Sequence, residues 1–144
     1  MNLTCQIATG LDALPAAREI RREVFMLEQG FTHEFDDTDA VALHLLFCDG
    51  DTPAATGRVY PDISRPGLWH IGRVAVRKPF RGKGIGAQVI ARLEEEIRHL
   101  GGMSVELDAQ LQAEGFYQRL GYVRAGEEHL DEHCPHVTMR KKLE

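Results

Sequence analysis

Apolar and polar residues alternate along the chain in a pattern that predicts strands and helices with no linker between them. Strand-like apolar runs lie at residues 3–9, 40–48, 53–61 and 68–77. Asp49-Gly50 predicts a hairpin turn after the second run, and the sequence "SRPG" predicts another turn after the third. The last three runs therefore predict a meander of antiparallel strands.

The first predicted helix lies between the first two strands. It opens at Pro15, which a helix tolerates in its first turn, and it ends at Gly30. Its apolar stripe consists of Ala17, Ile20, Val24 and Leu27. The next segment, residues 30–39, carries five acidic or histidine side chains, so we interpret it as a loop too polar for the core.

A longer helix follows the fourth strand, and its apolar stripe ends before Gly101-Gly102. That stripe consists of Ile85, Val89, Leu93, Ile97 and Leu100. A strand over 103–109, a short helix over 112–121 and two strands over 122–128 and 136–143 complete the pattern. The order predicts an α+β fold in one domain, residues 1–144, with a mostly antiparallel mixed sheet of about six to seven strands flanked by helices.

Composition narrows the class of protein. With 144 residues, 43% of them apolar, the chain can build one core, and its net charge of -5 argues against nucleic-acid or anionic membrane partners. No apolar run approaches the roughly 20 residues of a membrane helix, and the first residues lack the features of a secretory signal. Cys5, Cys48 and Cys134 form no C-x-x-C pair, which favours free thiols. We therefore expect a cytoplasmic protein.

A glycine-rich basic turn separates the fourth strand from the long helix. The glycines are Gly82, Gly84 and Gly86, and the cations are Arg77, Lys78, Arg81 and Lys83. Such a turn presents backbone N–H groups and the positive end of a helix dipole to a phosphate. A Walker loop would need Ser or Thr after Gly-Lys, and a dinucleotide fingerprint would need G-x-G-x-x-G in a parallel sheet, so both fit poorly. A plain tight turn with a solvated basic rim stays open.

The turn and its flanks resemble one known family. The sequence "RGKGIG", residues 81–86, meets the pattern Arg/Gln-x-x-Gly-x-Gly/Ala of the acyl-coenzyme A loop in the GNAT superfamily of N-acetyltransferases. The preceding "RVAV" and the later "FYQRLGY" match the same family in order. The resemblance is close from Leu68 to Leu143. It implies a GNAT-like fold with a splayed fourth and fifth strand, and acetyl transfer from acetyl-coenzyme A to an amine in a ternary complex.

The same resemblance implies which residues hold acetyl-coenzyme A (acetyl-CoA). Backbone amides of the glycine turn would take the pyrophosphate, and the preceding strand would pair with the pantetheine arm. Gln110 stands where the family often has an asparagine that touches this arm. The predicted cofactor-binding residues are Val74, Ala75, Val76, Arg81, Gly82, Lys83, Gly84, Ile85, Gly86 and Gln110.

Acetyl transfer needs a base and an acid. An ordinary α-amine has a pKa of about 8 and is mostly charged at neutral pH, and the departing thiolate takes up a proton. Tyr117 matches the family's general acid, with Phe116 facing the core instead. The ending "PHVTM" resembles the glyphosate N-acetyltransferase branch, where His136 matches the base. Without the resemblance, Tyr117 is a packed aromatic and His136 a strand histidine. A carboxylate acting through water is the alternative base.

The acceptor is less defined. The glyphosate branch binds its dianion with several arginines, most of which are absent here. Arg73, one residue away in register, either substitutes for one of them or serves only the structure. Glu28 is a candidate for holding a cationic substrate, and a solvated helix end is the alternative. We expect a small-molecule amine as acceptor and allow for a homodimer. A non-catalytic acyl-CoA sensor and a peptide or protein acetyltransferase are the alternatives.

Histidines and cysteines crowd the tail of the sequence. His129, His133, Cys134 and His136 are metal-ligand types, but their spacing matches no established ligand set, so we expect no metal. We interpret His44, on an apolar strand, as a core histidine.

Overall fold

Seven strands form one mixed sheet in the computed structural model, which describes the whole chain from Met1 to Glu144. Their order is β1-β2-β3-β4-β5-β7-β6, and every neighbouring pair is antiparallel except the parallel pair β4 and β5. The strands are β1 (Leu3–Thr9), β2 (Leu43–Asp49), β3 (Thr52–Pro61), β4 (Leu68–Val76), β5 (Ser104–Gln110), β6 (Val123–Asp131) and β7 (Cys134–Lys142). The predicted α+β fold is confirmed.

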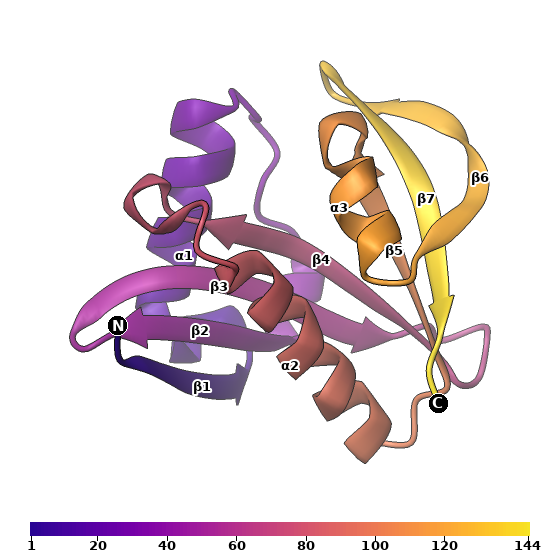
Figure 1. Cartoon of the computed structure of the whole chain (residues 1–144), viewed down its shortest axis with the longest axis horizontal. Coiled ribbons are helices and arrows are strands. Elements are labelled where there is room, and N and C mark those ends of the chain that lie inside the picture. The colour runs from indigo at the N-terminus through magenta and orange to yellow at the C-terminus, as the bar shows by residue number, and fades with distance from the viewer.

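Helices cover both faces of the sheet (Figure 1). Helix α1 (Pro15–Arg21) packs behind β3 in this view, and α2 (Ile85–His99) crosses in front of β3 and β4. The other helical segments are η1 (Leu11–Ala13), η2 (Arg22–Glu28), η3 (Asp37–Ala40), η4 (Lys78–Phe80), η5 (Leu111–Ala113) and α3 (Glu114–Arg119). Each face has its own apolar core, one beside α2 and one beside α1.

The first helix changes geometry halfway along. Helix α1 continues from Arg22 as the π-helix η2. A π-helix bonds residues five apart, which shifts the direction in which each later side chain points. Phe25 is therefore buried, whereas Leu27, which α-helical spacing put on the buried stripe, is 67% exposed. The prediction for Leu27 is wrong, and the π-helix is the reason.

Several predicted boundaries shift in the structure. The second strand begins at Leu43 instead of residue 40, because residues 37–40 form η3. Helix α2 ends at His99, which leaves Leu100 48% exposed instead of on the buried stripe. The two last strands are longer than predicted and form a hairpin. No helix is long and apolar enough to cross a membrane.

Strands β4 and β5 pair only where they begin. Their register joins Leu68 to Ser104, Trp69 to Val105 and His70 to Glu106, and it stops there. Figure 1 shows the two strands diverging beyond this point. The predicted splay is confirmed, and it separates the sheet into β1–β4 and β5–β7–β6.

A bulge interrupts β4 within the splayed region. Arg58 of β3 pairs with Gly72 and Thr56 pairs with Ala75, so Gly57 alone faces the two residues between them. Arg73, the first of these two, has a φ of 52°, in the left-handed region that non-glycine residues rarely occupy. Bulges with such strain concentrate next to active sites.

Candidate active site

A cavity of about 660 Å³ fills the splay between β4 and β5. Its walls come from both halves of the sheet, from η2 and its following loop, and from η5 and α3. Six residues predicted from the sequence line it: Arg73, Val74, Arg81, Gln110, Tyr117 and His136. The structure therefore brings together the two predicted catalytic residues and part of the predicted cofactor site.

The other predicted residues lie outside the cavity lining. Ala75 is buried against α1, and Val76 packs on the opposite core. The turn residues, from Gly82 to Gly86, precede and begin α2. Glu28 lies at the end of η2, where its carboxylate accepts hydrogen bonds of 2.9 and 3.1 Å from Arg81. Glu28 therefore meets the glycine turn, and its role toward an acceptor stays a prediction.

The glycine turn leaves the start of α2 open. Gly82 and Gly84 both have a φ of 76°, which requires glycine or strain, and a Cβ at either would meet no neighbour within 4 Å. Gly84 is the N-cap residue of α2, and no side chain caps the helix there. The first amides of α2 are thus available to an anion.

The charges around this turn are partly paired. Arg77 binds Glu23 at 3.1 Å, and Arg81 binds Glu28 at 2.9 Å. Lys78 forms no ion pair within the chain. Its neighbour in the turn, Lys83, is also unpaired, so two ammonium groups stay available for phosphates.

Tyr117 enters the cavity from α3. Its ring packs edge-on against Phe116, with centroids 5.0 Å apart, and against Tyr122, with centroids 5.8 Å apart. Both Phe116 and Tyr117 pack on the main core, so the prediction that only Phe116 would do so is wrong. Both rings are only partly buried, so neither side chain has to face the core fully. Burial alone raises the pKa of Tyr117 to about 12, so the phenol keeps its proton at neutral pH.

His136 enters the cavity from β7 and is 6% exposed. Its Nδ1 lies 2.8 Å from the carbonyl oxygen of Cys134. Because a carbonyl can only accept, Nδ1 carries the proton, and the neutral ring keeps its lone pair on Nε2. The ring of His129 stacks beside it at 6.1 Å, and Phe31 lies 6.3 Å away at a steep angle. The ring is held in the form that a general base needs.

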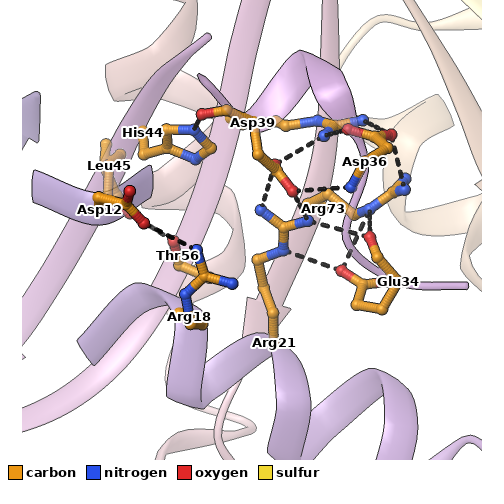
Figure 2. A network of polar contacts seen from close by, with 11 residues as sticks. Asp12, Arg18, Arg21, Glu34, Asp36, Asp39, His44, Leu45, Thr56 and Arg73 are labelled. Carbon is orange, nitrogen blue, oxygen red and sulfur yellow. Dashed lines mark hydrogen bonds and ion pairs between the residues drawn. The ribbon is translucent and has the colours of Figure 1, made fainter. Parts of the chain in front are cut away.

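A buried network of arginines and carboxylates lies beside the cavity, and Glu34, Arg58 and Arg73 of this network line it. Figure 2 shows the network. Arg21 of α1 is 1% exposed and donates to Glu34 at 2.8 Å and to Asp39 at 2.7 and 3.1 Å. Burial acts to raise the pKa of Asp39, but hydrogen bonds and charge from Arg21 outweigh it and lower that pKa to about 2. The interpretation of residues 30–39 as too polar for the core is therefore wrong for Glu34 and Asp39.

Two further arginines reach the same carboxylates from the sheet. Arg58 donates to Asp36 at 2.7 Å and to Asp39 at 2.8 Å. Arg73 donates to the carbonyl of Glu34 at 3.1 Å and lies 3.3 Å from Asp36. Hydrogen bonds from Arg58 lower the pKa of Asp36, whereas burial raises the pKa of Glu34. The network fixes the loop against the cavity.

The prediction that His44 is a core histidine is confirmed. It is fully buried, and its Nε2 lies 3.0 Å from the carbonyl oxygen of Asp39.

Two other contacts join the walls of the cavity. Gln110 donates to Gln29 of the η2 end at 2.8 Å and accepts from Gln112 at 2.5 Å. Glu132, in the β6–β7 turn, accepts from the backbone amides of Thr32 and His33 at 2.9 Å each. These amides lower the pKa of Glu132 to about 2. The loop at residues 30–39 is therefore tied to the hairpin that carries His136.

Sequence reasoning missed this network, although one signal was present. Arg21 lies four residues after Ala17 and three before Val24, which puts a charge on the buried stripe of α1. A charge in that position requires buried partners. The acidic loop after Gly30 was the nearest source of them.

Of the tail histidines, His129 and His136 stack on each other. The structure holds no group of three or more histidine, cysteine or carboxylate side chains placed to bind a metal ion. All three cysteines are free thiols.

Comparisons with known proteins agree with this geometry. The family model described as "Acetyltransferase (GNAT) domain" matches residues 15–143. The uncharacterized protein YyaT of Bacillus subtilis strain 168 is 34% identical over 96% of this chain and 94% of its own length. The uncharacterized N-acetyltransferase YjcF of the same strain is 33% identical over 94% of this chain and 96% of its own. The crystal structure of an acyl-CoA N-acyltransferase from Pseudomonas aeruginosa is 30% identical, with a TM-score of 0.84 over 97% of this chain and 98% of that one.

Proposed function

The chain belongs to the GNAT acetyltransferase family, and from that premise we propose that it moves an acetyl group from acetyl-CoA to the amine of a small molecule. The observation that carries the proposal is the meeting of Tyr117 and His136 in one cavity with the splayed strand β4. One side chain suited to take the proton of the amine and one suited to protonate the leaving thiolate thus line the same cavity.

The donor side of the proposal rests on the glycine turn. The uncapped start of α2 would take the pyrophosphate, with Lys78 and Lys83 near the phosphates. The pantetheine arm would lie along Val74 to Val76 in the splay, as an added strand. Gln110 would exchange its bond to Gln29 for one to the arm.

The chemical step then follows from the two side chains. Nε2 of His136 takes a proton from the acceptor ammonium, and the freed amine attacks the thioester carbonyl. The C–N bond forms, and a tetrahedral oxyanion results, which a backbone amide freed at the β4 bulge would stabilise. As the C–S bond breaks, Tyr117 gives its proton to the leaving thiolate. The nitrogen, which is cationic after the attack, loses its second proton to solvent as the amide forms. His136 also releases its proton to solvent and the phenol regains one, so one proton is released for each acetyl group transferred.

The size of the site supports a small molecule as the acceptor. The cavity must hold the thioester end of the donor as well, so a small amine fits the remaining space better than a folded protein tail. A substrate-binding role for Glu28, a cytoplasmic location and a homodimer stay predictions, and Arg73 is either an acceptor ligand or a structural residue. So does membership of the glyphosate N-acetyltransferase branch, which the match of His136 supports.

The proposal is tested by titrating the protein with acetyl-CoA in a calorimeter and then following thiol release with a panel of amines and amino acids. The Gly84→Val variant is the matched control. Because Gly84 has a φ of 76° and open space at its Cβ, valine adds strain and covers the anion position. We expect its dissociation constant to rise about tenfold or more, equal to 1.4 kcal/mol. Unchanged affinity in Gly84→Val would contradict the phosphate site, and binding without thiol release would favour the sensor.

Tyr117→Phe tests the general acid. The variant keeps the ring contacts to Phe116 and Tyr122 but has no proton to give, so we expect kcat to fall about 10²-fold with little change in acetyl-CoA affinity. Tyr122→Phe is the control, since that hydroxyl donates to Glu94 at 2.7 Å inside the core. Steady-state kinetics and calorimetry measure both quantities. An equal loss in the two variants would show that a change in packing, and not the lost proton, lowers the rate.

A further inference from the structure

The bulge in β4 turns the side chain of Arg73 toward the loop at residues 30–39. Ile71 and Val74 both pack on the core beside α2, although residues three apart in a regular strand face opposite sides. The extra residue of the bulge brings Val74 back to the face of the sheet that Ile71 occupies. Gly72 lies opposite Arg58, and the side chain of Arg73 reaches the loop that Arg58 also contacts. In a regular strand, the guanidinium would point into the apolar core.

The loop holds the guanidinium in this position. Nε of Arg73 lies 3.1 Å from both the carbonyl and the carboxylate of Glu34, and Nη2 lies 3.3 Å from Asp36. These acceptors are fixed in turn by the buried Arg21 and Arg58. All hydrogen-bonding groups that hold Arg73 thus belong to residues 34–36. Their hydrogen bonds offset the free-energy cost of a backbone conformation that is unfavourable for arginine.

The cavity depends on this segment of β4. Ile71, Gly72, Arg73 and Val74 line it in succession, and a bulge leaves one residue outside the strand ladder. A shift of the bulge by one residue would turn the following side chains to the wrong faces and withdraw the free backbone group. We propose that Arg73 is a positioning residue, not an acceptor ligand: it couples the loop 31–40 to the β4 bulge and so aims the bulge backbone at the thioester.

This inference rests on the proposed transferase function, so the wild-type enzyme is assayed first. Arg73→Gly removes the guanidinium and relieves the strained φ, Arg73→Ala removes only the guanidinium, and Arg73→Lys keeps a cation. We expect kcat to fall about 10- to 100-fold in the glycine and alanine variants, with acceptor KM little changed, and lysine to recover part of the loss. Arg92→Ala, which breaks a partly buried pair with Glu96 on α2, far from the β4 bulge in sequence, is the control.

A second measurement does not depend on activity. Amide hydrogen exchange at residues 72–75 should quicken about tenfold or more in Arg73→Gly and Arg73→Ala. Asp36→Asn weakens the ion pair between Asp36 and Arg73 at a side chain that is 40% exposed. This variant should speed up exchange at residues 72–75 to a smaller degree, even if the Arg73 variants fold poorly.

The outcomes separate the two proposals. A rise in acceptor KM at constant kcat would make Arg73 an acceptor ligand and overturn the inference. Unchanged exchange at residues 72–75 would overturn it as well. Absence of turnover in the wild type would overturn the proposed function, while faster exchange in the variants would still support the coupling of loop and bulge.

Discussion

Arg21→Met is expected to destabilise the fold by about 3–5 kcal/mol, the usual penalty for removing one member of a buried ionic cluster. The methionine fills a similar volume, but it leaves Glu34 and Asp39, 5% and 6% exposed, without the cation that joins them. Arg58 continues to hold Asp39, whereas Glu34 keeps only the more exposed Arg73. Urea unfolding at neutral pH measures the difference.

The penalty should shrink as the pH falls. In the wild type, Asp39 has a pKa of about 2, below the ordinary value near 3.9, so its ionised form adds stability above about pH 4 and loses this effect as the pH falls toward 2. Without Arg21, the folded-state pKa of both carboxyl groups rises. Protonation of these carboxyl groups then removes more of the unfavourable buried charge in the variant than in the wild type. The difference in the free energy of unfolding between the two proteins therefore becomes smaller.

Arg18→Met on the same helix is the matched control. Arg18 pairs with Asp12 at the protein surface, where the two side chains are 41% and 98% exposed. Figure 2 shows this pair apart from the buried network. Such surface pairs contribute about 0–1 kcal/mol. Equal losses in the two variants, or a penalty for Arg21→Met that stays constant with pH, would show that packing and not charge explains the effect.

Local signals were enough to predict the sheet and the glycine turn. The apolar stripe of α2, the turn at Asp49-Gly50 and the glycines before Ile85 each act through neighbouring residues, and a short window reports them. Leu27 shows the limit, because a π-helix has no distinct pattern of apolar residues, and its phase is set by packing against the sheet.

The acidic loop shows a second limit. Its carboxylates are buried because arginines from α1, β3 and β4 meet them, and those partners lie between 13 and 39 residues away in sequence. A window centred on the loop sees only its charges. The partners of Arg73 were hidden for the same reason, since the bulge that turns it toward the loop depends on the register with β3.

His136→Ala is expected to lower kcat by roughly 10²- to 10⁴-fold at neutral pH, the range that general base catalysis provides. The imidazole is the cavity side chain whose hydrogen bond, 2.8 Å from Nδ1 to the carbonyl of Cys134, fixes a free lone pair on Nε2. Its loss leaves the acceptor to shed its proton to solvent. Acetyl-CoA affinity should stay the same.

The pH profile separates this role from a structural one. If His136 is the base, the wild-type rate has an acid limb, because a protonated imidazole cannot accept the acceptor's proton. In His136→Ala this limb should disappear, and the rate should instead rise with pH toward the acceptor's own pKa, about 8 for an α-amine or 10.4 for a lysine-like amine. The difference in rate between the wild type and His136→Ala therefore becomes smaller at alkaline pH. A packing defect would not produce this change.

His129→Asn is the control for this experiment, because that ring stacks on His136 at 6.1 Å but does not line the cavity. Its profile should match the wild type. If His136→Ala kept the wild-type acid limb and rate, the base would be a carboxylate acting through water. Glu34 would be the first candidate, since it lines the same cavity and burial raises its pKa.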